Sequence, residues 1–399
     1  MANMPTLKNL DVAGKRVLVR VDFNVPMHDG MVSDESRIMA HLPTIEWLVQ
    51  NKAKVILMSH LGRPDGKKDM KYTLKPVAQR LSGHLSQEVQ FAEDCVGPIA
   101  EKAVAALGDS QVLLLENLRF YAEEEANEQG FARKLAKMAD VYISDAFGTA
   151  HRAHASITGV PQYVPVCAFG EVMTRELSAL TKVLETPEKP VLVIIGGAKI
   201  SSKIDVVRNL LPKADMMMIG GAMANTFLAA LGHKMGNSLY ESEYVQAANR
   251  ILADSAIVGC RLLLPSDVVC AAKLENGVAT NVAKVDAIPA GEMALDIGPT
   301  TVELWQRMSQ NAQTILWNGP MGAAEFNPFH EGTEAMARAV GKSAAYSVAG
   351  GGDTLAALAK TGMTREISYV STGGGALMEF LEGKTLPGIA AIQDKVQAA

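Results

Sequence analysis

The chain has 399 residues, of which 48% are hydrophobic, 20% charged and 5% aromatic, and this predicts a globular protein of two or three domains. Its 34 glycines and 17 prolines are spread along the chain, so the composition excludes a disordered or collagen-like protein. The formal net charge of −5 argues against nucleic acid as the main partner, because no overall positive potential attracts a polyanion.

The N-terminal segment lacks an apolar signal region, and no later run reaches the roughly 18 apolar residues that span a bilayer. We therefore expect a cytoplasmic protein with no membrane partner. The cysteines form no C-x-x-C pair and lie among apolar residues, which predicts buried, reduced thiols rather than disulfides or zinc ligands. They are Cys95, Cys167, Cys260 and Cys270.

Short runs rich in valine, isoleucine and leucine recur along the chain, each followed by a turn and a stretch of helical periodicity. Continuous apolar strands of this kind are typical of a parallel sheet covered by helices on both faces, so the sequence predicts an α/β fold. The clearest predicted strands are Arg16–Val21, Lys54–Met58, Gln111–Leu115, Val141–Ser144, Val191–Ile195, Met216–Ile219, Arg261–Leu264, Thr314–Trp317, Ala344–Val348 and Glu366–Val370.

Apolar residues recur at steps of three and four in two segments, 38–49 and 173–184, which predicts a helix in each. The second segment lies between Pro165 and the sequence ETPEKP at 185–190, and such punctuation indicates a domain boundary. We therefore expect a first domain over 1–170, a connecting helix and linker over 171–189, and a second domain over 190–380.

Arginine and histidine residues follow the first four of these strands in the first half of the chain. Ligands of open α/β sheets bind at the carboxyl ends of the strands, and guanidinium groups match carboxylate and phosphate oxygens. The pattern predicts a site for a small ligand with more than one negative group. The basic residues are Arg20, Arg37, Arg63, Arg119, Arg152, His60, His151 and His154.

Other interpretations of these residues remain open from the sequence. Each arginine alone is equally consistent with a solvated strand end. The HRAH sequence at 151–154 is compatible with a metal site, but no cysteine or carboxylate completes a ligand set of known spacing. Asp22 and Asn24 could orient a substrate hydroxyl or hold one of the arginines.

The second half carries glycine-rich turns after its strands, at 196–197, 220–221, 319–322, 350–352 and 373–375. Glycine lets the backbone approach a ligand, and a helix that starts there directs free N–H groups at an anion. Lys199 and Lys203 are one helical turn apart, so we expect both ammonium groups to project from one helix start towards a polyphosphate. Neither a P-loop motif nor a G-x-G-x-x-G dinucleotide motif is present.

Asp353 is the best candidate for holding Mg²⁺ on nucleotide phosphates, because this hard cation prefers oxygen ligands. Glu325 could accept a hydrogen bond from a ribose hydroxyl. A nucleotide half and an anion half joined by one helix predict group transfer across a cleft that closes to exclude water.

The motifs of the chain resemble those of one family, the phosphoglycerate kinases, over nearly the whole length and in the family's order. They are VLVRVDFNVP, MSHLGRP, LLENLRF, DAFGTAHRAHAS, GGAKISSKI, WNGPMG, GGGDT and STGGGA. The resemblance implies two Rossmann-like domains that close like a hinge, and a monomer. It also implies reversible phosphoryl transfer between 1,3-bisphosphoglycerate and MgADP, giving 3-phosphoglycerate and MgATP in glycolysis and gluconeogenesis.

The resemblance further implies a role for each matching position. The phosphoglycerate site would comprise Asp22, Phe23, Asn24, Arg37, His60, Leu61, Gly62, Arg63, Arg119 and Arg152. The nucleotide site would comprise Lys203, Glu325, Gly351, Gly352, Asp353 and Thr354, with Asp353 as the metal contact. Groups that stabilise the phosphoryl group in transit would be Arg37, Lys199, Lys203, Gly373, Gly374 and Gly375. The segment 381–399 would return to pack on the first domain.

The sequence departs from the commonest family pattern at Ala323 and Ala324, where many members have larger apolar residues, and we expect a looser wall of the nucleotide pocket. The connector FGEVMTREL also differs from the usual apolar start of that helix. The resemblance also implies that the enzyme needs no general base. The attacking group would be the carboxylate of 3-phosphoglycerate, and a carboxylate with a pKa of about 4 is already ionised at neutral pH. Two rival functions are a non-catalytic anion-binding protein on the same fold and a dinucleotide-dependent oxidoreductase, which the missing motif argues against.

Overall fold

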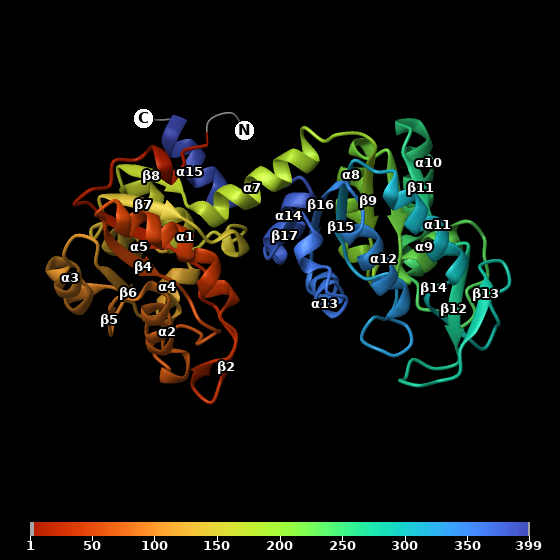
Figure 1. The fold of residues 1–399 in the computed structure, drawn as a ribbon, viewed down its shortest axis with the longest axis horizontal. Coiled ribbons are helices and arrows are strands. Elements are labelled where there is room, and N and C mark those ends of the chain that lie inside the picture. Colours follow the sequence, from red (N-terminus) through yellow and green to blue (C-terminus); the bar gives the residue numbers. More distant parts are fainter. Residues whose placement is uncertain (1–3, 398–399) are drawn as a thin grey trace. The chain divides into compact units, whose positions relative to one another are not determined.

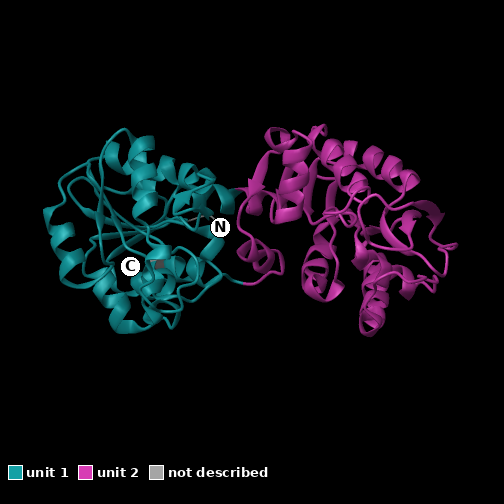
Figure 2. Ribbon diagram, turned by 90° about the horizontal axis from the view of Figure 1, so that it is seen from below, with its two compact units in different colours: residues 1–178, 385–399 teal, residues 179–384 magenta. Residues whose placement is uncertain are grey.

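The computed structural model describes residues 4–397, which form two compact units (Figure 2). Unit 1 contains the described residues up to Ser178 and those from Thr385 onward, and unit 2 is Ala179–Lys384. The boundary between them falls inside helix α7 (Glu171–Leu184). The last helix, α15 (Pro387–Gln397), packs within unit 1 against strand β8 and helix α6.

Unit 1 is built on a six-stranded sheet in the order β5-β6-β4-β1-β7-β8, in which every pairing is parallel (Figure 1). Residues at the centre of β1, such as Leu18, are fully buried, as expected of a strand with helices on both faces. The strands are β1 (Arg16–Arg20), β4 (Lys54–Met58), β5 (Val89–Ala92), β6 (Val112–Leu115), β7 (Val141–Ser144) and β8 (Val166–Phe169), and a separate hairpin is β2 (Met27–His28) with β3 (Met31–Val32).

Helices and short helical turns connect the strands of unit 1 and cover its sheet (Figure 1). Helix α1 coincides with the apolar periodicity at 38–49 and buries Ile38, Ile45 and Leu48 in the unit's core. The helical elements are η1 (Leu7–Asn9), α1 (Ser36–Gln50), η2 (Met70–Tyr72), α2 (Lys75–Leu85), α3 (Gly97–Ala106), η3 (Leu118–Phe120), α4 (Ala122–Glu125), α5 (Gln129–Ala136), η4 (Phe147–Thr149), η5 (Ala155–Gly159) and α6 (Val160–Tyr163).

Unit 2 has its own six-stranded parallel sheet, in the order β11-β10-β9-β15-β16-β17. Numbered along the chain, this is the 3-2-1-4-5-6 order of the Rossmann fold. The strands are β9 (Val191–Ile195), β10 (Met216–Ile219), β11 (Arg261–Leu263), β15 (Thr314–Asn318), β16 (Tyr346–Gly350) and β17 (Tyr369–Ser371).

A three-stranded antiparallel sheet is added to unit 2, with β12 between β13 and β14. It has its own small core with Leu228, Met235 and Val268. These strands are β12 (Asp267–Ala271), β13 (Asn281–Lys284) and β14 (Met293–Ile297). The helical elements are η6 (Ile200–Ser202), α8 (Ile204–Leu210), η7 (Leu211–Lys213), α9 (Ala222–Ala230), η8 (Ser242–Tyr244), α10 (Val245–Val258), α11 (Pro299–Gln310), α12 (Glu331–Gly341), α13 (Gly352–Lys360), η9 (Thr364–Glu366) and α14 (Gly375–Leu381).

The predicted α/β fold with two parallel sheets is confirmed, and every predicted strand has a counterpart in the structure. Strands β5 and β8, the hairpin β2–β3 and the three-stranded sheet were not predicted from the sequence. The last two strands, β16 and β17, begin two and three residues later than predicted, because the apolar runs begin in the preceding loops.

The four cysteines are free and buried, as predicted. Burial raises the pKa of the thiols, to about 12 for Cys167 and to about 11 for Cys260 and Cys270. Among the residues that the structure describes, no helix is long and apolar enough to cross a membrane.

Candidate active site

Each sheet has a point where the strand order reverses, and ligands of such sheets bind outside the carboxyl ends of the strands at that point. In unit 1 it lies between β1 and β7, and in unit 2 between β9 and β15. The basic residues of the first half and the glycine turns of the second half follow these strands, so each unit presents one candidate site.

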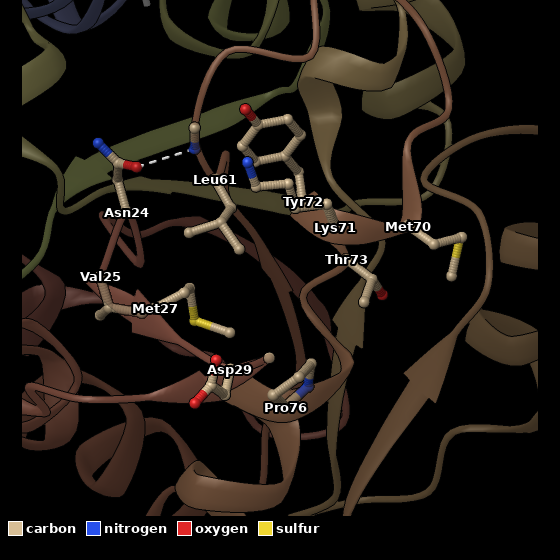
Figure 3. Close-up of a pocket in the computed structure, with 12 residues that line it drawn as sticks. Asn24, Val25, Met27, Asp29, Leu61, Met70, Lys71, Tyr72, Thr73 and Pro76 are labelled. Atoms are coloured by element: carbon tan, nitrogen blue, oxygen red, sulfur yellow. Dashed lines mark hydrogen bonds between the residues drawn. The ribbon is translucent and has the colours of Figure 1, made fainter.

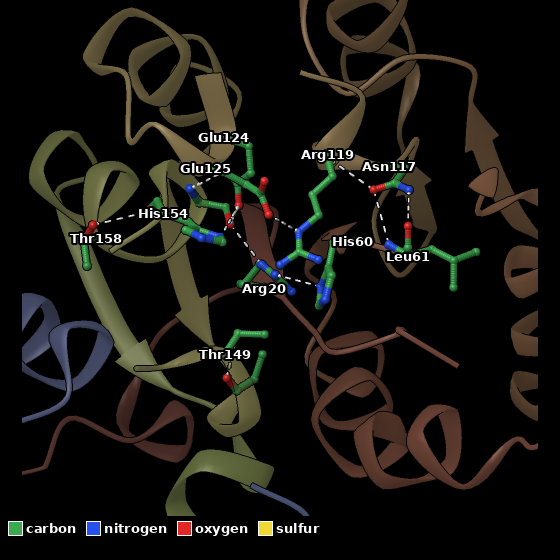
Figure 4. A network of polar contacts seen from close by, with 12 residues as sticks. Arg20, His60, Leu61, Asn117, Arg119, Glu124, Glu125, Thr149, His154 and Thr158 are labelled. Atoms are coloured by element: carbon green, nitrogen blue, oxygen red, sulfur yellow. Dashed lines mark hydrogen bonds and ion pairs between the residues drawn. The ribbon is translucent and has the colours of Figure 1, made fainter. Parts of the chain in front are cut away.

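Arg20 ends β1 and is almost completely buried. Its Nε donates to Ser156 Oγ at 2.9 Å, Nη1 donates to the carbonyl of Val21, and Nη2 contacts His60 Nδ1 at 3.1 Å (Figure 4). Because all three guanidinium nitrogens bond to the protein, Arg20 supports the structure of the site. Ser156 in turn donates to Glu124, a fully buried carboxyl group whose pKa is raised by burial.

The contact with Arg20 also fixes the protonation of His60. Burial lowers the pKa of His60 well below its usual value, and the charges of four arginines lower it further. The ring is therefore neutral at pH 7, and because Nδ1 accepts from Arg20, its proton lies on Nε2. Those arginines are Arg20, Arg119, Arg152 and Arg37, so the structure brings together residues from separate parts of the chain.

His154 belongs to the same cluster. Burial and the charges of Arg119, Arg20 and Arg152 lower its pKa to about 4. Within the described residues, no group of three or more histidine, cysteine, aspartate or glutamate side chains is placed to hold a metal ion. The low pKa leaves the ring of His154 neutral at pH 7.

Of the two roles considered for Asp22, the structure shows that of holding an arginine. Asp22 Oδ2 accepts from Arg37 Nη1 at 2.7 Å, with Arg37 reaching from the first turn of α1. The backbone N–H of Asp22 donates to His41 Nε2, and His41 Nδ1 lies 2.9 Å from Asp145 Oδ2. This chain fixes the loop after β1 to the start of the loop after β7.

The loop after β4 is held next to Asn24 and Arg119. Gly62 N donates to Asn24 Oδ1 at 2.9 Å (Figure 3), and the carbonyl of Gly62 accepts from Arg119 Nη1 at 2.8 Å. A cavity of about 490 Å³ adjoins Asn24, Leu61 and Gly62. Gly62 has φ +63°, and a Cβ there would lie 2.4 Å from the ring of Tyr72, so only glycine fits this position.

The remaining predicted residues of unit 1 differ in exposure. Arg63 is exposed and Arg152 half-buried, so both can reach a ligand from solvent. Phe23 is buried in the core, and its backbone N–H donates to Ser59 Oγ at 2.8 Å. Phe23 therefore positions the loop through its backbone and packing.

In unit 2, Lys203 turns back towards the sheet. Its Nζ donates to the carbonyl of Gly196 at 2.6 Å and to Asn318 Oδ1 at 2.7 Å, at the ends of β9 and β15. Burial lowers the pKa of Lys203 from 10.5 to about 8, partly opposed by the charge of Asp353. A half-desolvated ammonium group at the point of strand reversal is well suited to bind phosphate.

Lys199 does not accompany Lys203 as the sequence predicted. Lys199 is exposed and precedes the short turn η6, whereas Lys203 follows that turn and is drawn inward by the carbonyl groups at the strand ends. The two ammonium groups therefore do not project together from one helix start. Their one-turn spacing in sequence is interrupted because 200–202 is a 3₁₀ turn and α8 begins only at Ile204.

Asp353 lies in the first turn of α13, and it lines a cavity of about 160 Å³ together with Glu325 and Ala324. The small side chain of Ala324 forms part of the wall. Thr354 is buried, and its hydroxyl accepts from Gly319 N at 2.7 Å, so it fastens α13 to the turn after β15. A single exposed carboxylate fits Mg²⁺ that arrives on phosphates, since this ion needs only one or two protein carboxylates.

The glycines permit close backbone contacts. Gly319 has φ +97°, and a Cβ there would lie 2.1 Å from the carbonyl of Gly196. Gly351 precedes α13 with φ +96°, Gly352 is its first residue, and Gly373 to Gly375 lead into α14. Both helix starts place backbone N–H groups at the carboxyl edge of the sheet.

Several residues that organise these sites were not predicted from the sequence, among them Asn318, Ser156 and Glu124. Asn318 holds Lys203, and Ser156 with Glu124 holds Arg20. The position of Asn318, a polar residue directly after an apolar strand, was a usable signal. Nothing in the sequence around Glu124, which lies in an acidic run, indicates that this one carboxylate is buried.

The chain is similar to known proteins over nearly its whole length. The family model described as "Phosphoglycerate kinase" matches residues 7–384. A phosphoglycerate kinase from Moorella thermoacetica is 52% identical over 390 residues, covering 98% of this chain and 99% of that protein. Another, from Pelotomaculum thermopropionicum, is 50% identical over the same length and coverage. The solved structure of phosphoglycerate kinase from Coxiella burnetii has 41% identity and a TM-score of 0.93, over 98% of this chain and 100% of that one.

Proposed function

The chain belongs to the phosphoglycerate kinase family and has phosphoglycerate kinase activity, and we propose that unit 1 binds the phosphoglycerate while unit 2 binds the nucleotide. It is a phosphotransferase of glycolysis and gluconeogenesis that uses ATP and ADP, with a carboxyl group as acceptor. The chain would work as a cytoplasmic monomer.

The single observation that supports the phosphoglycerate site best is the group of arginines that jointly lower the pKa of His60. Phosphoglycerate carries a carboxylate and a phosphate, and both groups match forked guanidinium donors. Arg63, Arg119 and Arg152 would bind the phosphate, and the Nε2–H of His60 would donate to a substrate oxygen. Asp22 would orient Arg37, and Asn24 would complete the site.

The nucleotide would lie at the strand ends of unit 2. Lys203 would bind phosphate, Glu325 would accept from the ribose, and the N–H groups at Gly351–Thr354 would face the phosphates. Mg²⁺ would be held by Asp353, and when bound it supplies positive charge that neutralises phosphate oxygens. Of these residues, Glu325 and Asp353 line the same cavity.

Catalysis would depend on position and charge. The attacking group of 3-phosphoglycerate is a carboxylate that is ionised at neutral pH, so no residue has to remove a proton. Arg37, Lys199 and the N–H groups of Gly373–Gly375 would stabilise the phosphoryl group in an in-line transition state. Closure of the two domains would bring the reactants into line and exclude water.

The test measures KM for each substrate in a coupled assay of ATP-dependent 3-phosphoglycerate phosphorylation. Arg152→Ala and Arg63→Ala should raise KM for 3-phosphoglycerate about tenfold or more, the loss expected for a charged hydrogen bond, with KM for ATP little changed. Arg16→Ala is the matched control, because Arg16 lies at the opposite end of β1 and pairs with Asp140. Equal effects of all three variants would contradict the assignment.

A further inference from the structure

Asn117 follows β6 in the ENLRF motif, and it is completely buried. Its amide uses every hydrogen bond that it can form. Oδ1 accepts from Leu61 N at 3.2 Å and from Arg119 N at 3.0 Å, and Nδ2 donates to the carbonyl of Leu61 at 2.8 Å (Figure 4). Nδ2 also donates to the carbonyl of Tyr72 at 2.9 Å. An asparagine has two acceptor sites and two donors, so none is left for a ligand.

These bonds converge on the loop that carries the proposed substrate residues. Both the N–H and the carbonyl of Leu61 bond to the one amide, and Leu61 lies directly between His60 and Gly62. The amide also bonds to the backbone of Arg119, whose side chain donates to Gly62. Asn117 therefore fixes the loop after β4 relative to the arginine after β6.

Glu116 secures the other end of the same loop. Its carboxylate is buried and accepts from Leu74 N, from Thr73 Oγ1 and from Asn117 N, at 2.7 to 2.9 Å. The loop thus has one attachment at Leu61 and a second at Thr73 and Leu74. A loop held at both ends by buried polar groups has few alternative conformations, since each lost bond leaves a desolvated group unpaired.

We propose that Asn117 is a positioning residue of the phosphoglycerate site, which sets the register of His60, Gly62 and Arg63 relative to Arg119 without touching the substrate. This inference rests on the proposed phosphoglycerate site. The Arg119 side chain bonds to Gly62, so a shift of the loop would misplace both the arginine and the histidine at once. Specificity for the shape of the substrate depends on such pre-organisation.

The test uses Asn117→Asp, which keeps the shape of the side chain. The amide nitrogen that donates two hydrogen bonds becomes an oxygen, which faces the carbonyls of Leu61 and Tyr72 and cannot donate to them. Two net hydrogen bonds are worth roughly a 30-fold change, so KM for 3-phosphoglycerate should rise about 10- to 30-fold. KM for ATP should change by less than about twofold, because the nucleotide residues lie in unit 2. Asn117→Ser provides a neutral second variant should the aspartate variant fold poorly.

The matched control is Asn209→Asp in unit 2, where Nδ2 of Asn209 donates one bond to the carbonyl of Leu381. This variant should leave KM for 3-phosphoglycerate unchanged. Hydrogen exchange provides a second measurement, since the N–H of Leu61 loses its acceptor in Asn117→Ser and should exchange faster there. Folded Asn117 variants with normal exchange at Leu61 and normal KM for 3-phosphoglycerate would overturn the inference.

The two proposals fail in different ways. If Arg63→Ala and Arg152→Ala leave KM for 3-phosphoglycerate unchanged, the substrate site itself is wrong. If those variants raise it and the Asn117 variants do not, only the positioning role is wrong. Equal increases in KM for both substrates would show that Asn117 contributes to stability alone.

Discussion

If Lys203 binds the nucleotide phosphates as proposed, its buried ammonium group should make nucleotide binding depend on pH. Its pKa is lowered from 10.5 to about 8 because the side chain is largely buried against the ends of β9 and β15. With that pKa, about 90% of the free enzyme carries the charge at pH 7 and about 10% at pH 9. If only the charged form binds the phosphates, KM for MgADP should rise about tenfold between pH 7 and pH 9.

The direction of this pH effect follows from the charge of Lys203. Above its pKa the amine is neutral and no longer attracts phosphate, so binding weakens as pH rises, and binding of MgADP at pH 9 should take up a proton. The folded-state pKa lies below the unfolded-state value, so the charged lysine costs folding free energy below about pH 8, and this cost disappears as pH rises towards 10.5.

The assay is steady-state turnover at pH 6.5 to 9.5 with each substrate varied in turn. KM for the phosphoglycerate is the internal control, because its proposed ligands are arginines and a histidine, His60, whose pKa lies well below its usual value. In Lys203→Met, KM for MgADP should be high and independent of pH. A flat KM for MgADP in the wild type, or a tenfold rise that persists in Lys203→Met, would refute the reasoning.

Three further predictions concern single residues. Arg37→Ala and Lys199→Ala should each lower kcat about 100-fold with the fold intact, as is typical for a lost preorganised charge, and near-normal turnover would contradict their role. Asp353→Asn should raise KM for MgATP several-fold, and an unchanged KM would argue against the metal contact. Gly319→Ala should lower Tm and weaken nucleotide binding, because its Cβ would lie 2.1 Å from the carbonyl of Gly196. Gly259→Ala is its control, since Gly259 also has positive φ but nothing within 4 Å, and equal loss of binding in both would contradict the steric argument.

Most of the strands that the sequence predicted are buried on both faces. Val191–Ile195 and Lys54–Met58 agree with the structure to the residue, because a continuous apolar run is the direct consequence of two covered faces. Two of the missed strands lack that run. Val89–Ala92 is an edge strand with a partly exposed Gln90, and Asn281–Lys284 buries only Ala283. Because these two strands are partly exposed, their short sequences resemble those of loops.

The site residues also divide into features that the sequence predicts and features that it does not. Arginines at strand ends are visible in sequence because the sheet brings all carboxyl ends to one edge. What the sequence does not contain is the direction of each side chain. Arg20 and Arg37 look alike, yet Arg20 bonds entirely to the protein and Arg37 pairs with Asp22 while remaining partly exposed. Lys199 and Lys203 differ likewise, because the acceptors that draw Lys203 inward come from β9 and β15, which are far apart in the chain.

The two proposed sites would hold an anion by different means, and this has a physical consequence. Unit 1 gathers arginines, whose charge does not titrate at working pH, around His60 and His154, which burial and the arginine charges keep neutral. The proposed site of unit 2 offers backbone N–H groups and a lysine whose burial lowers its pKa to about 8. The affinity for phosphoglycerate should therefore respond to ionic strength and hardly to pH, whereas the affinity for the nucleotide should respond to both. His60 and His154 should not produce a pH effect near neutral pH, because the pKa of each ring is lowered well below its usual value.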